Sequence, residues 1–256
     1  YRLSNQATTE LYDGYGYDLN GDKNTFENSY MYTRIVREND FNPGRTDYIA
    51  DQLNVDPGTW TFTKDDMPEN LKYKPAFMLG LHLNYGMDKR SAIIFNLDFA
   101  RLTVTGNFNI TTTKPPNTNQ FYPTLHAFPL RGQESRTSIQ LGYSRIFGNN
   151  KYINLFAEAG LCMNHARLKK YFVQIEEMHI DLTTFNYMFG GATYTEPEQY
   201  SGWGFGAFAG AGVYLRLNSR YTAQILYSPS YEKINLGTEP AANVQHKAGL
   251  RIFYRF

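Results

Sequence analysis

The chain has 256 residues, with 25 basic and 24 acidic side chains and a formal net charge of +1, so charge gives no case for nucleic acid as a partner. Its mean hydropathy of -0.50 and the lack of a run of about 18 apolar residues exclude a membrane-spanning helix, but not a membrane β-barrel, whose strands alternate apolar and polar residues. Aromatic residues make up 16% of the chain, an excess that suits girdles at membrane surfaces.

The N-terminal residues 1–27 are predicted to be a loop-like periplasmic extension, and residues 28–256 a β-barrel. Four residues of the extension have the alternate spacing of a calcium loop: Asp18, Asn20, Asp22 and Asn24. The glycine and the glutamate that complete an EF-hand loop are missing, so an Asn/Asp-rich turn is favoured. The single Cys162 has no metal-ligand spacing around it, and we expect no cofactor.

Alternation of apolar and polar residues predicts seven strands in chain order, at about 75–87, 90–110, 135–147, 151–174, 202–217, 220–235 and 246–256. Single-chain bacterial barrels normally have an even number of strands, and 28–38 is the best candidate for an eighth, although its alternation is poor. Within 90–110 the apolar parity changes near Ala100 and Arg101, which predicts a β-bulge.

Short and long connections alternate between these strands. The turns after the first, third and fifth are tight, whereas the segments near 38–73, 111–134, 176–200 and 236–245 are long and polar. This asymmetry is typical of an all-β transmembrane antiparallel up-and-down barrel, here of eight strands, with short periplasmic turns and long extracellular loops. A soluble β-sandwich or lipocalin-like barrel, with the apolar parity facing a core, is the alternative.

The C-terminal strand carries the most specific pattern. Its polar residue, glycine, two spaced hydrophobic residues and final phenylalanine are Lys247, Gly249, Ile252, Tyr254 and Phe256. This pattern resembles the insertion signal of outer-membrane proteins, which the barrel-assembly machinery engages. The tyrosine-rich loops look like those of the small outer-membrane β-barrel proteins of Bacteroidota. The resemblance implies the outer membrane of a Gram-negative bacterium, with lipid, lipopolysaccharide and other outer-membrane proteins as partners.

The inward parity of the predicted strands carries charges. A barrel of eight strands has an interior that side chains fill, so these charges should pair with one another rather than line a pore. The predicted network consists of His82, Asp98, Glu158, Arg216, Arg251 and Arg255, with Asp98 and Glu158 among Arg216 and Arg251.

Two functions remain open on the sequence. The first is a non-enzymatic accessory or scaffold subunit of a larger outer-membrane assembly, secretion or uptake complex, whose loops contact partners through residues such as Trp60, Phe62, Tyr194 and Tyr200. The second is a lipid- or peptide-modifying hydrolase or acyltransferase with a site at the outer rim. No catalytic or metal motif accompanies the five histidines, which favours the first.

Overall fold

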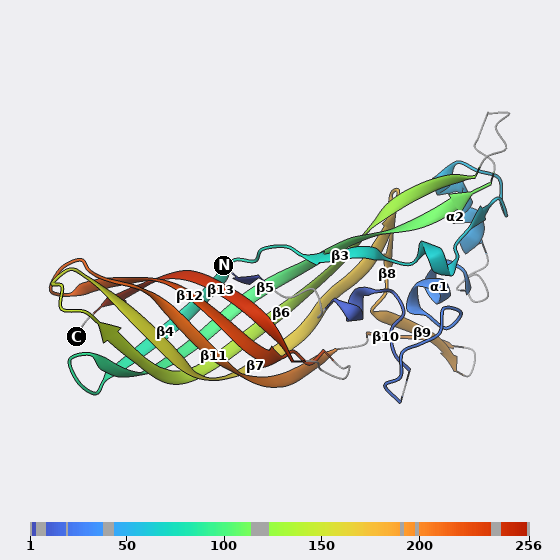
Figure 1. The fold of residues 1–256 in the computed structure, drawn as a ribbon. Helices are drawn as coiled ribbons and strands as arrows, with labels where there is room; N and C mark the ends of the chain where they lie inside the picture. Colours follow the sequence, from blue (N-terminus) through green and yellow to red (C-terminus); the bar gives the residue numbers. More distant parts are fainter. Residues whose placement is uncertain are drawn as a thin grey trace.

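The computed structural model describes residues 2–3, 9–18, 20–37, 44–113, 123–189, 192–197, 200–236 and 242–254, and for Leu3, 184–189 and 192–197 only the backbone. Its main feature is an antiparallel sheet of eleven strands (Figure 1). These strands are β1 (Arg2–Leu3), β2 (Trp60–Thr61), β3 (Glu69–Tyr73), β4 (Met78–Gly86), β5 (Ser91–Thr112), β6 (Thr124–Phe147), β7 (Ile153–Ile175), β8 (Met178–Asp181), β11 (Ser201–Arg216), β12 (Tyr221–Lys233) and β13 (Ala242–Tyr254).

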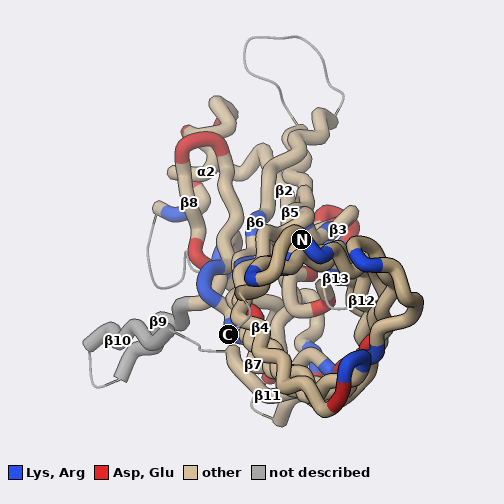
Figure 2. Tube along the Cα trace, turned by 90° about the vertical axis from the view of Figure 1, so that its left-hand side faces the viewer, with Lys and Arg blue, Asp and Glu red and all other residues tan. Residues whose placement is uncertain are grey.

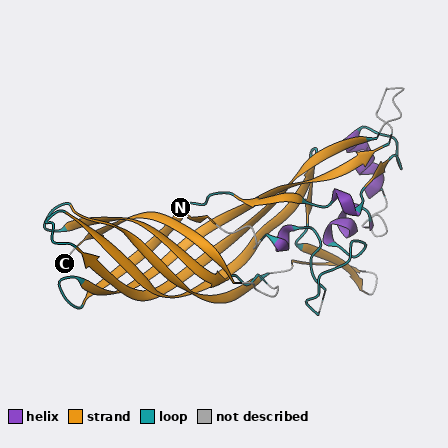
Figure 3. Cartoon of the chain, viewed as in Figure 1, coloured by secondary structure: helices purple, strands orange, loops and turns teal. Residues whose placement is uncertain are grey.

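The other elements lie at the end of the sheet opposite the short turns (Figure 3). They are the hairpin of β9 (Thr184–Phe189) and β10 (Ala192–Pro197), the helices α1 (Tyr30–Ile35) and α2 (Arg45–Leu53), and two 3-10 turns, Glu10–Tyr12 and Lys64–Asp66. No helix among the described residues is long and apolar enough to cross a membrane.

The long strands are neighbours in the sheet in the order in which they occur in the chain, which gives β5-β6-β7-β11-β12-β13. Strands β4, β3 and β2 pair along the other side of β5. Seen end-on, the sheet curls into a ring-like outline (Figure 2). Its two sides meet through the interior, where Arg251 of β13 binds Glu158 of β7. The seven strands predicted from residue 75 onward therefore exist as β4, β5, β6, β7, β11, β12 and β13.

The closed barrel of eight strands is not what the structure contains. The sheet has eleven strands, and no ladder joins β4 to β13 in the part of the chain that is described. The two-residue strand β1 lies between them: Arg2 pairs with Lys247 of β13 and bridges to Ala76, just before β4. The sheet is thus curled but not closed along the length of these two edges.

The expected first strand, 28–38, is also wrong, because its centre is helix α1. Ser29 caps this helix by accepting a hydrogen bond from the Tyr32 amide at 3.1 Å. The buried residues Tyr30, Met31, Arg34 and Ile35 have helical spacing, which explains why the segment alternates poorly as a strand.

Strand β5 exchanges the polarity of its two faces along its length. All its residues pair with β6 in continuous register, so the β-bulge predicted near Ala100 and Arg101 is wrong. In the first half the outward side chains are Ile93, Phe95, Leu97 and Phe99; in the second half they are Arg101, Thr103, Thr105, Asn107 and Asn109, and the buried inward ones are Leu102, Val104, Phe108 and Ile110. The parity is constant, and the surroundings of the strand change.

Strands β6 and β7 make the same exchange. The outward residues of β6 turn from Ile139, Leu141 and Tyr143 to Arg131, Gln133 and Ser135, and those of β7 from Leu155, Leu161 and Met163 to His165 and Arg167. A register shift occurs beyond this point, where Gln133 pairs with Lys170 and Glu134 with Leu168. Lys169 is the extra residue of this bulge, which bends the strands away from the ring.

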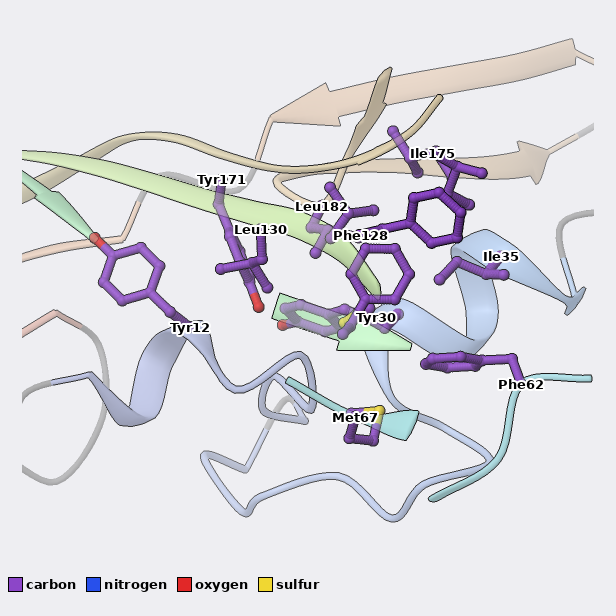
Figure 4. Packing of buried hydrophobic residues seen from close by; sticks show 14 of the residues in the cluster. Tyr12, Tyr30, Ile35, Phe62, Met67, Phe128, Leu130, Tyr171, Ile175 and Leu182 are labelled. Atoms are coloured by element: carbon purple, nitrogen blue, oxygen red, sulfur yellow. The ribbon is translucent and has the colours of Figure 1, made fainter. Parts of the chain in front are cut away.

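In the halves of β5, β6 and β7 that lie away from the short turns, the inward side chains form a hydrophobic core with the N-terminal residues. We call this region the distal part: residues 9–73 with 101–112, 124–137 and 165–182. Figure 4 shows Tyr12, Tyr30 and Phe62 packed with Phe128 and Tyr171. Residues from both sides of position 27 share this core, and its N-terminal members lie at the end of the sheet away from the short turns (Figure 1).

Candidate membrane interface and polar interior

An exposed apolar surface surrounds the curled part of the sheet; we call it the apolar belt. Its outward aliphatic residues include Leu79, Leu81, Leu83, Ile93, Leu141, Leu155, Leu161, Ile225, Leu250 and Ile252. Leu161 is 72% exposed and Ile252 69%, values far from those of core residues. The register continues the belt across neighbouring strands, since Leu81, Leu97, Ile139, Met163 and Phe205 are successive partners.

Aromatic side chains lie at both ends of the belt. Near the short turns the exposed aromatic residues are Tyr85, Phe147, Tyr152, Tyr221 and Tyr254. Towards the distal part they are Phe77, Phe99, Trp203, Phe205 and Tyr231. Aliphatic residues between two aromatic girdles are the pattern that lipid-facing barrel surfaces show, because aromatic rings favour the interface between lipid and water.

Basic side chains follow directly beyond the belt. Arg101, Ser135, Arg167 and Ser201 are successive partners across β5, β6, β7 and β11. Farther out, the same outer face carries exposed Lys72, Lys74, Arg131, Lys169 and Lys170. Two carboxylates lie on the neighbouring strands: Glu69 of β3 is opposite Asn107, and Asp181 of β8 is opposite Phe172.

The interior enclosed by the belt contains paired charges. Arg251 donates to both carboxylate oxygens of Glu158, and the Lys247 ammonium lies 3.2 Å from the Asp98 carboxylate. Arg2 pairs with Glu232 at 2.5 Å, and both side chains are fully buried. Charges removed from water must be paired in this way to be tolerated.

The predicted network is brought together only in part. His82 bonds Asn96 and packs its ring edge-on against Phe253. Arg216 is exposed at the end of β11. Glu158 pairs with Arg251, a member of the predicted network, whereas Asp98 pairs with Lys247, which is not a member. Arg255 lies outside the described residues.

Large side chains occupy part of the interior, and the backbones of β11 and β12 approach each other closely. Phe156 and Phe208 are almost fully buried. A Cβ at Gly206 would lie 2.2 Å from the Tyr231 carbonyl oxygen, and one at Gly212 2.0 Å from that of Ile225. On the side of β7 and β11, side chains therefore occupy the interior beside its polar groups.

A second polar cluster lies where the interior meets the distal core. The Glu134 carboxylate accepts hydrogen bonds from Arg136 at 2.5 Å, Tyr12 at 2.9 Å and Tyr73 at 3.0 Å. Burial and the neighbouring Glu134 carboxylate raise the pKa of Tyr12 above its ordinary value. These groups cross-link β6 to the N-terminal segment and β3 within the distal part, and Arg136 also donates to the Gln245 side chain of β13 at 3.2 Å, which ties the distal part to the ring.

The sequence contained some signals for these groups. Lys247 and Arg136 share the inward parity of their strands with Asp98 and Glu134, so alternation could have found them. Lys247 was instead assigned to the insertion signal, and residue 134 fell outside the predicted strand. Arg2 lies in the segment expected to be an extension, and nothing near it in the sequence indicates a partner 230 residues away.

The residues of the predicted insertion signal divide between the faces of β13. Lys247 and Gly249 face inward, whereas Ile252 and Tyr254 are exposed on the belt, and Phe256 lies outside the described residues. The predicted partner-contacting residues Trp60, Phe62 and Tyr200 are buried, and Tyr200 bonds Tyr30 within the distal core. The side chain of Tyr194 lies outside the described residues.

The histidines do not gather into a reactive cluster. The contacts described for the five histidines join them to Asn96, Phe253, Thr112, Phe128, Trp203, Phe172 and Tyr227, none of which is a carboxylate. Among the described residues there is no group of three potential metal ligands. Sequence comparison found no matching protein-family model and no matching curated protein.

Proposed function

We propose that this chain is a non-enzymatic outer-membrane protein that inserts its curled sheet into the bilayer and acts as an accessory or scaffold subunit of a larger outer-membrane complex. The observation that carries the proposal is the exchange of polarity along β5 at a constant strand parity. Apolar side chains face outward beside a polar interior, and then polar side chains face outward beside an apolar core. This exchange is expected where a strand leaves lipid and enters water.

The dimensions of the belt agree with membrane insertion. Strand β4 has nine residues, and a tilted transmembrane strand needs about 9–11. In water a contiguous apolar surface of this extent, around the whole curled part of the sheet, would promote aggregation. In a bilayer the same side chains require no further partner.

The packed interior supports a scaffold rather than a pore. The paired charges at Glu158 and Asp98 and the buried rings of Phe156 and Phe208 occupy the space that a channel would need. The distal part then supplies a folded surface outside the bilayer, where other outer-membrane proteins would bind. The machinery that inserts β-barrels would be a transient partner during assembly.

The basic band favours an anionic lipid as the partner. Lys169 and Lys170 are exposed beside Arg101 and Arg131, next to the aromatic end of the belt. A phosphorylated lipid such as lipopolysaccharide would place acyl chains on the belt and phosphates on these cations. The distal part would then lie on the extracellular side of the membrane.

Two lysine substitutions on one strand test membrane insertion. Leu97 and Asn107 both lie outward on β5, in the belt and in the distal part. Leu97→Lys should strongly reduce the folded protein in the membrane fraction, since lysine in the centre of a lipid-facing wall costs about 2–4 kcal/mol. Asn107→Lys, the matched control, should insert normally. Equal tolerance of both substitutions would contradict membrane insertion.

The scaffold role needs a separate measurement. The protein, solubilised from its native membrane in mild detergent, should migrate with other outer-membrane proteins in a stable complex. Chemical cross-links should map to the distal part, for example to Lys169 and Lys170. A monodisperse single chain without cross-linked partners would contradict the scaffold proposal and leave the membrane proposal standing.

A further inference from the structure

The unclosed part of the ring is a seam between β4 and β13. At one end of the seam Arg2 lies between the two strands: its amide donates to the Ala76 carbonyl at 2.9 Å, and the Ala76 amide donates back at 3.0 Å. On its other side Arg2 pairs with Lys247. Beyond this point, no ladder or bridge joins residues 78–84 to residues 249–253, all of which are described.

The backbone groups along the seam have a defined direction. Because Ala76 exchanges both hydrogen bonds with Arg2, every second residue after it, Met78, Gly80, His82 and Asn84, directs its amide and carbonyl to the same side. Arg2 directs its own groups to Ala76, so the residues of β13 that face the seam alternate with Lys247 and include Leu250 and Ile252. Both edges therefore present hydrogen-bonding groups to the seam.

The exposure of β4 shows that its inner face is poorly covered. Gly80 and Asn84 are exposed although their parity is inward, whereas the inward residues Ile94 and Asn96 of the neighbouring β5 are each 1% exposed. Inside the seam, the rings of His82 and Phe253 meet with centroids 4.9 Å apart. Long side chains thus reach across the seam while the backbones of the two strands remain without a shared ladder.

We infer that the seam is the binding site for one additional antiparallel strand, continuous with β1 on its N-terminal side. Strand β1 already runs antiparallel to β13 and bridges in the same sense to Ala76, so its continuation enters the seam in register with both edges. In a bilayer this strand would also form hydrogen bonds with the backbone amides and carbonyls of both edges, which lipid cannot do. This need for hydrogen bonds favours closure independently of the pairing geometry.

The register specifies the side chains of the added strand. The second, fourth and sixth positions before Arg2 would lie between Gly249 and Met78, between Arg251 and Gly80, and between Phe253 and His82, all on the inner face. Small or polar residues fit there, because even a Cβ at Gly80 would lie 2.2 Å from an Asp98 carboxylate oxygen. The third and fifth positions would lie beside Leu250 and Leu79, and beside Ile252 and Leu81, on the apolar belt. An apolar residue is required at these outward positions.

Two N-terminal extensions placed ahead of Tyr1 test this inference. The sequence VSLSVS puts its apolar residues on the outward parity counted from Arg2, and SVSLSV has the same composition on the opposite parity. Amide hydrogen exchange of the folded chain in detergent is measured for peptides covering 78–84 and 249–253. Peptides covering the β6–β7 ladder are the internal control, because those strands pair with each other throughout.

The in-phase extension should slow exchange in both seam peptides by about tenfold or more, leave the β6–β7 peptides unchanged and raise the melting temperature. The out-of-phase extension should do neither. Two results would overturn the inference: equal effects of the two extensions, or seam amides in the unextended chain already as protected as the β6–β7 ladder. Because exchange is read on purified folded protein, either result is distinguishable from failure to insert into a membrane.

Discussion

Arg251 and Glu158 form a two-fold hydrogen bond across the interior of the sheet, with nitrogen–oxygen distances of 2.7 and 2.9 Å. The Glu158 side chain is 1% exposed and that of Arg251 17%, so the pair is largely removed from water. Since the residues belong to β7 and β13, on opposite sides of the ring, the bond ties these sides together without a shared ladder.

Removing one member of this pair should destabilise the sheet without opening a pore. Glu158→Gln leaves the guanidinium of Arg251 uncompensated, and we expect a loss of about 3 kcal/mol, read as a lower melting temperature in detergent. The double change Glu158→Gln with Arg251→Met should recover part of the loss. Planar-bilayer recordings of the unmodified protein should show no stable conductance, and a unit conductance like that of a general porin would refute the packed interior.

The two faces of β11 should respond oppositely to larger side chains. Gly206→Ala adds a Cβ that would lie 2.2 Å from the Tyr231 carbonyl oxygen, so it should sharply lower the yield of folded protein. Ala209→Leu, three residues away on the outward parity, should be tolerated because its side chain adds to the belt. The heat-modifiable folded fraction on gels measures both variants. A reversed order of the two yields would mean that the inward and outward assignments are exchanged.

The end of β13 should control insertion. Tyr254 is 47% exposed beside Tyr221, with ring centroids 5.5 Å apart, in the aromatic group near the short turns. Tyr254→Asp, combined with deletion of Phe256, should reduce the folded form in the membrane fraction, while Tyr254→Phe keeps it. An unchanged folded yield in the combined variant would contradict an insertion role for this end.

The distal part should depend on aromatic residues from the segment that the sequence suggested was a loop. Phe62 is 6% exposed and packs on Phe26 and Phe108, so Phe62→Ala should cost about 3 kcal/mol and make the distal part sensitive to protease. Tyr48→Ala is the control: this residue is 49% exposed, and its loss should change stability by less than about 0.5 kcal/mol. Similar protease sensitivity in the two variants would contradict the assignment of Phe62 to this core.

Alkaline pH should weaken the distal part through Tyr12. Its pKa is raised by burial and by Glu134, so the folded state holds the phenolic proton more tightly than the unfolded chain, whose reference pKa is 10.0. This contribution to stability is complete below that reference pKa and is lost as pH rises through the folded pKa. The free energy of unfolding, measured between pH about 8 and about 11, should decline as pH rises, and the decline should be shallower in Tyr12→Phe. An unchanged slope in Tyr12→Phe would rule out Tyr12 as a titrating group.

The sequence predicted the long strands well because their alternation does not depend on partners. Glu158 and Arg251 pair in the interior, and the inward position of each follows from the parity of its own strand. It could not pair Asp98 with Lys247 rather than with Arg216, because partners across the interior depend on strand tilt and stagger. The bulge predicted at Ala100 was wrong because two different structures give the same sequence pattern. Apolar residues change parity at a bulge, and they also change parity where a regular strand passes from apolar to polar surroundings.

The features that could not be predicted from the sequence depend on packing between residues. Helix α1 has six residues, too few for a clear helical pattern, and its end is fixed by Ser29. Trp60 and Phe62 were predicted to contact partners because they lie in a long polar segment, but the segment folds back onto β5 and buries them. Arg2 reaches Glu232 only through the fold.

The most direct test of the central claim is the environment of outward side chains along β5 in liposomes. Fluorophores attached to single cysteines at Ile93, Leu97, Thr105 and Asn107, in a chain whose buried Cys162 is replaced by serine, are exposed to a lipid-soluble and an aqueous quencher. The account predicts quenching from lipid at Ile93 and Leu97 and from water at Thr105 and Asn107, with the change near Phe99 and Arg101. Aqueous quenching at all four positions would contradict it.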